Sequence, residues 1–302
     1  MRVFITGATG YIGFHTALAF RRAGYMVYGL TRTPQRAIRL ARHEIKPVVG
    51  SLQNPDSFLH LAAESDVVVH AAIDYESDSA ALDTITVERL LERLSASLTP
   101  KALLYTSGVW VYGNQDARPV QEQSSLNPPQ VVAWRPAVEQ MVLNARKVRG
   151  IVIRPGVVYG KTGGLTGSWF EAAASGEHLR VIGDGYNRWA MVHVEDLTQG
   201  YVQAAAWSRS NEIFNLVGPA QDTVIEMVSE IARINRKIRQ IDFIPLTQAL
   251  DEIGPLAEAL ALNQLVDAKK ARRLLNWQPH HQSFRTEVDT YYWAWQAAAG
   301  HV

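Results

Sequence analysis

Residues 6–13 read TGATGYIG, and this stretch decides the fold. It follows the β-branched run RVFIT at residues 2–6 and opens a run with helical spacing. Gly7 permits a tight turn, Gly10 lets the backbone approach a pyrophosphate, and Gly13 lets the helix pack close to the strand. Free N–H groups at the start of that helix, together with its dipole, favour a phosphate. The stretch therefore predicts a strand–turn–helix unit that binds a dinucleotide.

Short apolar runs alternate with helical stretches through the first half of the chain. The expected strands are RVFIT (2–6), YMVYGL (25–30), KPVVG (46–50), DVVVHAA (66–72), KALLYTS (101–107) and GIVIRP (150–155). The expected helices cover residues 11–23, 34–42, 54–64, 78–98 and 133–147. Apolar strands that alternate with helices indicate a parallel sheet covered on both faces. With right-handed crossovers, the pattern predicts an α/β fold with a doubly wound parallel sheet, the Rossmann architecture.

The pattern loosens after about residue 160. Helices are expected at 168–175, 195–207, 222–235, 254–262, 267–275 and 283–298, and short strands near 179–182, 190–193 and 212–217. We therefore predict a nucleotide-binding domain over residues 1–160. A smaller mixed α/β lobe over 161–302 would bind the substrate, with some of its elements returning to the first domain.

The composition excludes several functional classes. The chain has 302 residues and a formal net charge of +1, so no global field directs it to nucleic acid or to an anionic membrane. No stretch approaches the roughly 20 apolar residues of a membrane span, and the strand expected from Arg2 leaves no room for a signal peptide. The chain has no cysteine, and its histidines show no metal-ligand spacing. We expect a cytoplasmic protein with a small-molecule substrate and no metal.

The end of the second expected strand bears on the cofactor. An NAD site usually has Asp or Glu there, which binds the ribose 2′-hydroxyl. Here residues 30–36 read LTRTPQR, with Arg32 just past the strand and no acid. An arginine can pair with the 2′-phosphate of NADP. The sequence therefore favours NADP, with NAD as the alternative.

Six segments in order along the chain carry a family resemblance. They are TGATGYIG (6–13), VVVHAA (67–72), TSGVWVYG (106–113), VIRPGVVYG (152–160), IGDGYNRWAMVHVEDL (182–197) and DAKKARRLLNWQP (267–279). Together they resemble the extended short-chain dehydrogenases/reductases, the superfamily of nucleotide-sugar epimerases, dehydratases and related reductases. The resemblance spans nearly the whole chain. The cofactor contacts that we expect are Gly7, Thr9, Gly10, Tyr11, Ile12, Gly13, Arg32, Ser51, Leu52, Ala71, Ala72, Ile73, Thr106, Ser107, Arg135, Pro155, Gly156 and Val157.

The same resemblance implies a catalytic tyrosine and a lysine four residues later, and both are missing. In VVAWRPAVEQMVL (131–143), Glu139 fits the glutamate that follows that lysine, which puts Arg135 in the lysine slot and Val131 in the tyrosine slot. A register three residues later also lacks both residue types. Arg135 can bind a ribose but cannot share a proton, because its pKa exceeds about 12. The pattern resembles the atypical subgroups, which keep the fold without the usual active-site residues.

Other hydroxyls are candidates for the proton donor. Gly108 fills the slot of the usual catalytic serine or threonine, and Ser107 precedes it by one residue. Tyr75 follows the fourth expected strand, and Tyr112 lies in the VYG run. All three hydroxyl-bearing residues are expected near the carboxyl edge of the sheet, where such folds bind ligands. Packing is the competing role for each tyrosine, and a backbone hydrogen bond is the competing role for Ser107.

Two residues are candidates for substrate contacts, and three functions compete. Tyr159 lies in the second VYG run, and Arg188 lies where relatives contact an anionic substrate group. The first function is an NADP-dependent oxidoreductase that acts on a small carbonyl or alcohol through a non-standard proton donor. The second is a non-catalytic NADP-binding sensor or regulator, and the third is a nucleotide-sugar epimerase or dehydratase. A homodimer is left open for all three.

Overall fold

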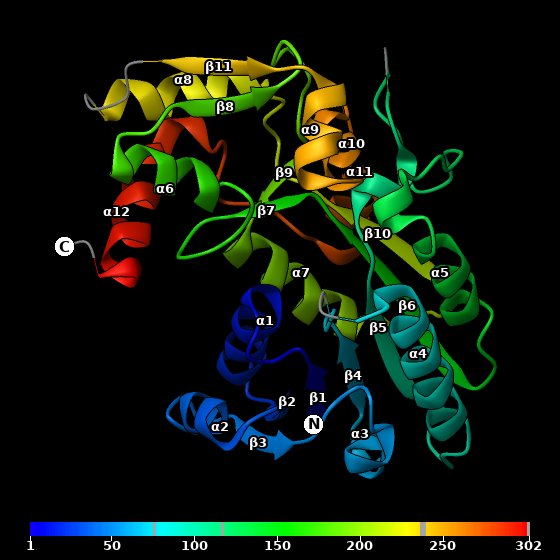
Figure 1. Ribbon diagram of the computed structural model, residues 1–302. Helices are drawn as coiled ribbons and strands as arrows, with labels where there is room; N and C mark the ends of the chain where they lie inside the picture. The colour runs from blue at the N-terminus through cyan, green and yellow to red at the C-terminus, as the bar shows by residue number, and fades with distance from the viewer. Residues whose placement is uncertain (75–76, 116–117, 236–239, 301–302) are drawn as a thin grey trace.

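A seven-stranded parallel sheet forms the centre of the computed structural model, which describes residues 1–74, 77–115, 118–235 and 240–300 (Figure 1). Its order is β10-β6-β5-β4-β1-β2-β3, and every adjacent pair is parallel. The strands are β1 (Arg2–Thr6), β2 (Met26–Thr31), β3 (Lys46–Val49), β4 (Val67–His70), β5 (Lys101–Thr106), β6 (Val148–Pro155) and β10 (Glu212–Leu216). This order confirms the predicted doubly wound α/β fold.

The strand order reverses next to β1. Its chain neighbour β2 lies on one side, and β4 lies on the other. Because Thr6 pairs with His70, the carboxyl ends of β1 and β4 are level and open onto one crevice. Ligands of open α/β sheets bind outside such a switch point.

Helices cover both faces of the sheet (Figure 1). One apolar core joins the sheet to the helices α1 (Tyr11–Arg22), α2 (Pro34–Ala41), α7 (Val194–Ala206) and α11 (Lys269–Leu275). The core on the opposite face joins it to α3 (Leu59–Glu64), α4 (Ser79–Ser95) and α5 (Arg135–Leu143). The last helix is shorter than the predicted span 133–147: a 3-10 turn over Gln130–Val132 precedes it, and Pro136 lies in its first turn, where a missing N–H costs nothing.

The second half of the chain builds a smaller lobe above the carboxyl ends of the strands (Figure 1). It has two two-stranded parallel sheets, β7 (Val157–Tyr159) with β9 (Met191–His193) and β8 (Leu179–Ile182) with β11 (Ile241–Ile244). Its helices are α6 (Gly167–Ser175), α8 (Val224–Ile234), α9 (Leu246–Ile253), α10 (Leu256–Ala261) and α12 (Val288–Ala299). The elements β10, α7 and α11 return to the main sheet.

The predicted strands and helices of this half mostly form, with three additions. The strands β7 and β11 and the helix α9 are not part of the sequence prediction, because such short stretches carry little periodic signal. Within the described parts of the chain, no helix has the length and apolar character to cross a membrane.

Candidate active site

The glycine-rich turn packs tightly between β1, β4 and α1. Gly7 has a φ of +69°, and a side chain there would place its Cβ 2.6 Å from the Ala71 carbonyl oxygen. A Cβ on Gly13 would lie 2.2 Å from the Gly7 carbonyl oxygen. The N-cap of α1 is Gly10, which has no side chain to satisfy the first N–H groups of the helix. Those groups are left for an anion, so the turn fits a pyrophosphate.

A cofactor cavity of about 360 Å³ opens beside this turn. Its walls are Gly7, Thr9, Gly10, Tyr11, Ile12, Gly13, Leu30, Thr31, Arg32, Arg36, Gly50, Ser51, Leu52, Gln53, Ala71, Ala72, Ile73 and Asp74. All of the cofactor contacts expected between residues 7 and 73 are among them. The strand ends of β1, β2 and β4 thus bring together residues from four separate segments.

An acid that the sequence did not single out lies at the far end of the cofactor cavity. Asp74 follows β4, and its Oδ1 lies 3.8 Å from Nη1 of Arg32. Its Oδ2 also accepts a hydrogen bond from the Gln53 side chain. Our prediction considered only the end of β2, whereas the adjacent strand β4 supplies the carboxylate. The wall of the cofactor cavity therefore carries a cation and an acid beside each other.

A catalytic cavity of about 570 Å³ continues from the cofactor cavity. The two share Tyr11, Ile12 and Ile73. Its other walls are Ser79, Ser107, Gly108, Val109, Trp110, Val131, Val132, Trp134, Arg135, Pro155, Gly156, Val157, Val158, Gly164, Leu165 and Leu256. Most of these side chains are apolar. Val131, the residue that the sequence aligns with the usual tyrosine, lies on this wall and is apolar.

Ser107 offers a hydroxyl on the wall of the catalytic cavity. It is buried, and its backbone N–H donates to the Ile153 carbonyl at 2.8 Å, which fixes it at the end of β5. Its Oγ has no hydrogen-bond partner among the described residues. A buried hydroxyl without a partner costs free energy unless a ligand or a water molecule satisfies it. The Ser107 hydroxyl is therefore available to a ligand in this cavity.

Arg135 borders the same cavity from the first turn of α5. Its Nη1 donates to the Thr106 carbonyl at 2.6 Å, and its guanidinium lies 5.3 Å from the Trp134 ring centre. The hydroxyl of Thr106 instead receives a hydrogen bond from Tyr201 on α7. Arg135 therefore keeps a fixed positive charge at the lysine slot, while the Thr106 side chain is engaged away from the cavity.

The other candidate residues lie elsewhere. Tyr112 is buried, where its hydroxyl donates to Asn215 and accepts from Arg154, both at 2.8 Å, and burial raises its pKa to about 12. Tyr159 packs in the core of the small lobe against Phe284. None of these side chains lines the catalytic cavity, and Tyr75 lies outside the described residues. Tyr112 and Tyr159 thus have packing and hydrogen-bonding roles in this structure.

Arg188 is not among the residues that line the catalytic cavity. Its backbone N–H donates to the Asn263 side chain at 2.9 Å, and its carbonyl accepts from the N–H of Gln264. A bridge to Thr223 fixes its strand-like backbone. These contacts give Arg188 a place in the small-lobe framework.

A buried polar network that sequence reasoning missed supports the cavity wall. Asp83 on α4 accepts hydrogen bonds from Tyr105 at 2.6 Å and from Trp134 at 3.0 Å, and it lies 2.9 Å from Nε2 of His70. Burial acts to raise the pKa of Asp83, but the hydrogen bonds and charge of its partners, led by His70, lower it overall. The other nitrogen of His70 contacts Thr6 at 2.8 Å. The network links the Trp134 side of the catalytic cavity to the end of β1.

Comparison with known proteins identifies the family. Residues 3–217 match the NAD dependent epimerase/dehydratase family. The chain belongs to this family. Membership agrees with the nucleotide-binding turn and favours an enzyme over the non-catalytic sensor that the sequence left open.

Relatives of this epimerase/dehydratase-family chain match it over most of their length. The UDP-glucose 4-epimerase of Mycolicibacterium smegmatis is 26% identical, with 92% of this chain and 94% of that protein covered. An uncharacterised protein of Schizosaccharomyces pombe is 25% identical, with 97% and 100% covered. A solved UDP-glucuronic acid 4-epimerase from Bacillus cereus, in complex with UDP-glucuronic acid and NAD, has a TM-score of 0.83 at 19% identity, covering 99% and 100% of the two chains. Two of these three relatives are epimerases of UDP-sugars by name, and the third is uncharacterised.

Proposed function

We propose that the protein is an NAD(P)-dependent enzyme that exchanges a hydride with a hydroxyl-bearing carbon of a nucleotide sugar. The observation that carries this proposal is the pair of joined cavities, one at the phosphate-binding turn and the other holding the unpaired Ser107 hydroxyl. A bound nicotinamide cofactor supplies the hydride chemistry, and the protein supplies position. The family match and the nucleotide-sugar enzymes among the relatives support the substrate class.

Ser107 takes the place of the missing tyrosine in substrate binding. Its hydroxyl can donate to, or accept from, the oxygen on the reacting carbon. Arg135 stabilises negative charge on that side of the cavity but holds its own proton. In the oxidation direction, the substrate O–H hydrogen would pass to Ser107 Oγ while the serine's own hydrogen passes to a water molecule, so the serine stays neutral. We accordingly place the protein in an atypical active-site subgroup of its family.

For the cofactor we propose a preference for NADP. Arg32 and Arg36 both line the cofactor cavity where a 2′-phosphate would lie, and two arginines suit a phosphate. The Asp74 carboxylate near Arg32 opposes this preference, because it can bind a ribose hydroxyl and repels a phosphate. Arg32 favours NADP over NAD and Asp74 opposes that preference, so single substitutions at the two positions separate their contributions.

The experiment mixes the purified protein with NADP or NAD and with UDP-glucose, UDP-glucuronic acid or dTDP-glucose. Nicotinamide absorbance reports reduction, and NMR of the sugar reports epimerised or dehydrated product. The proposal expects turnover, and it expects Ser107→Ala to lower kcat about 10²-fold or more, the usual contribution of a positioned proton-transfer group. Tyr201→Phe, which removes a buried hydroxyl from α7 outside the catalytic cavity, is the matched control.

A small carbonyl compound is the second candidate substrate, favoured by the apolar walls of the catalytic cavity around Val109, Val131 and Leu165. The same assay with NADPH and a panel of ketones and aldehydes separates the two. Turnover of the panel without turnover of any sugar would overturn the nucleotide-sugar proposal. Tight cofactor binding with no turnover of either group would overturn both and leave a sensor.

A further inference from the structure

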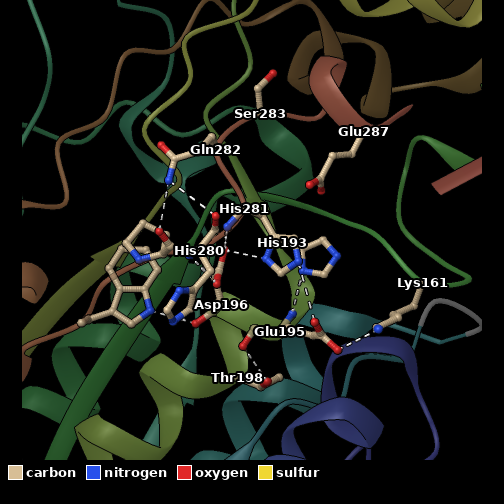
Figure 2. A network of polar contacts seen from close by, with 12 residues as sticks. Lys161, His193, Glu195, Asp196, Thr198, His280, His281, Gln282, Ser283 and Glu287 are labelled. Atoms are coloured by element: carbon tan, nitrogen blue, oxygen red, sulfur yellow. Dashed lines mark hydrogen bonds and ion pairs between the residues drawn. The ribbon is translucent and has the colours of Figure 1, made fainter. Parts of the chain in front are cut away.

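Two histidines and a glutamate meet outside the proposed active site (Figure 2). His193 ends β9, Glu195 lies in the first turn of α7, and His281 comes from the segment after α11. One ligand atom from each lies within 4.8 Å of the other two. The His193 and His281 rings stack with their centres 3.5 Å apart. Residues separated by more than 80 positions in the chain thus form one compact donor set.

The hydrogen bonds indicate which nitrogen of each imidazole carries the lone pair. Nδ1 of His281 lies 3.1 Å from Oδ2 of Asp196, and a carboxylate only accepts, so this nitrogen carries the proton. The lone pair of His281 is then on Nε2, which lies 3.7 Å from the Glu195 carboxylate. Nδ1 of His193 accepts from the Glu195 backbone N–H at 3.3 Å, so its lone pair is on Nδ1, and a metal bound there would replace this N-cap hydrogen bond. Figure 2 shows that these two nitrogens face Glu195.

The carboxylate behind His281 is itself held in place. Asp196 is buried, and its two oxygens accept from the backbone N–H groups of His280 at 2.9 Å and His281 at 3.0 Å. A histidine that ligates a metal almost always donates its other N–H to such a partner, which orients the ring and raises its basicity. The arrangement around His281 therefore matches the support that metal ligands require.

We propose that His193, Glu195 and His281 form a binding site for a divalent first-row transition metal such as Zn²⁺. Two neutral imidazoles and one carboxylate are a common donor set for this class, with ligand bonds of about 2.0–2.2 Å. The Glu195 side chain is 41% exposed and can move the short distance needed. Its present partner Lys161, whose Nζ lies 2.7 Å away, is 44% exposed and can turn into solvent.

The metal site lies directly behind the cofactor crevice. A Cβ on Gly160 would come 2.2 Å from Nε2 of His193, so the Gly160 backbone rests on that ring. The Gly160 carbonyl in turn accepts from the Tyr11 hydroxyl at 2.7 Å, and Tyr11 lines both cavities. A metal would therefore tie β9, α7 and the segment at His281 together beneath Tyr11. Its role is to brace the two parts of the fold, and it uses no residue of the proposed catalytic cavity.

The test is a titration of Co²⁺ and Zn²⁺ into the full chain, purified without a histidine tag and stripped with a chelator. Calorimetry should give one site per chain, Co²⁺ should develop visible ligand-field bands, and Zn²⁺ should raise the Tm because it binds only the folded state. His281→Asn and Glu195→Gln, both at partly exposed positions, should each weaken binding 10-fold or more. His178→Asn should leave the affinity unchanged, since His178 also contacts an aspartate but belongs to no three-ligand group among the described residues.

Two outcomes would overturn the metal site: no stoichiometric binding by the wild type, or equal affinity in His281→Asn and Glu195→Gln. Circular dichroism and NADP binding show whether each variant is folded. His193 is buried and its replacement can unfold the chain, so the conclusion depends on the other two ligands. Because the measurement is metal binding, a negative result would not bear on the proposed enzyme activity. A negative result in the turnover assay would likewise not bear on the metal site.

Discussion

At the scale of single residues, buried charge explains several features of this chain. Glu139, which sets the register of the 131–143 segment against the family pattern, is buried against Arg154 of β6. Nε of Arg154 donates to Oε1 of Glu139 at 3.0 Å, and a second hydrogen bond joins the pair. Arg154 also donates to Tyr112, which holds that tyrosine in the interior. Glu139 neutralises the buried cation Arg154, which explains why a glutamate stands on the buried face of α5.

Glu139→Ala is expected to destabilise the protein by about 3–5 kcal/mol, because it leaves the buried Arg154 uncompensated. Urea denaturation followed by circular dichroism measures the free energy of unfolding. Arg89→Ala, which breaks exposed ion pairs with Asp56 and Glu92, is the control and should cost less than about 1 kcal/mol. Similar small losses for both variants would contradict this account of Glu139.

The two charged residues at the ribose end of the cofactor cavity predict opposite changes in cofactor preference. Arg32→Ala should lower the ratio of NADP to NAD affinity about 10-fold, because it removes a cation from the 2′-phosphate. Asp74→Asn should raise the same ratio, because it removes a repulsive carboxylate. Fluorescence titration with each cofactor measures both ratios. An unchanged ratio of NADP to NAD affinity in Arg32→Ala would show that this arginine does not contact the 2′-phosphate.

His15 on α1 predicts a pH dependence of stability. Burial, with nearby Lys161 and Arg39, lowers its pKa from 6.5 to about 4. Between these two values the unfolded chain binds the proton and the folded chain does not, so the free energy of unfolding falls as the pH drops through this window. Denaturation curves at several pH values should show a flatter dependence for His15→Asn than for the wild type. Parallel curves would contradict the assignment to His15.

At the scale of elements, the start of α1 is the most tightly constrained junction. The helix begins one residue after Gly10 and passes Gly13 against the Gly7 carbonyl, so the turn and the helix cannot move independently. Helix α5 has a different constraint. Trp134, just before it, is hydrogen-bonded to Asp83 on α4, and Arg135 is bonded to the end of β5. Helix α5 is therefore anchored both to α4 and to the carboxyl end of β5.

Gly13→Ala is expected to weaken NADP binding at least 10-fold and to destabilise the fold by about 1–3 kcal/mol, as overpacking does. The added Cβ would lie 2.2 Å from backbone oxygen, and backbone cannot yield as a side chain can. Gly167→Ala in α6 is the matched control, because its Cβ would meet nothing nearer than 3.7 Å. Cofactor titration and urea denaturation measure the two effects. If Gly13→Ala behaved like the control, the close packing would have no energetic consequence.

At the scale of the whole molecule, both lobes contribute to the catalytic cavity. Ser107 and Arg135 come from the nucleotide-binding domain, whereas Gly164, Leu165 and Leu256 come from the smaller lobe. A ligand that fills the crevice therefore binds the folded arrangement of both parts.

Cofactor binding should stabilise the molecule as a whole. At a free concentration about 100 times its Kd, NADP is expected to add about 2.7 kcal/mol to the free energy of unfolding. Thermal denaturation with and without NADP, followed by tryptophan fluorescence and by circular dichroism, measures the gain. Both signals should shift to higher temperature together. A shift in neither signal, with NADP or with NAD, would contradict the cofactor cavity.

The sequence by itself determined the doubly wound fold, the phosphate-binding turn and the absence of tyrosine and lysine from residues 131–143. These are local features: apolar runs of strand length, glycines within eight residues, and side-chain types at fixed spacing around Glu139. Only the tertiary structure decided that Ser107 lines the catalytic cavity with an unpaired hydroxyl, that Asp74 lies beside Arg32, and that His281 reaches His193. These contacts join residues that are far apart in the sequence. They depend on which strand ends are neighbours in the sheet and on where the chain returns to them, and a pattern within one segment specifies neither.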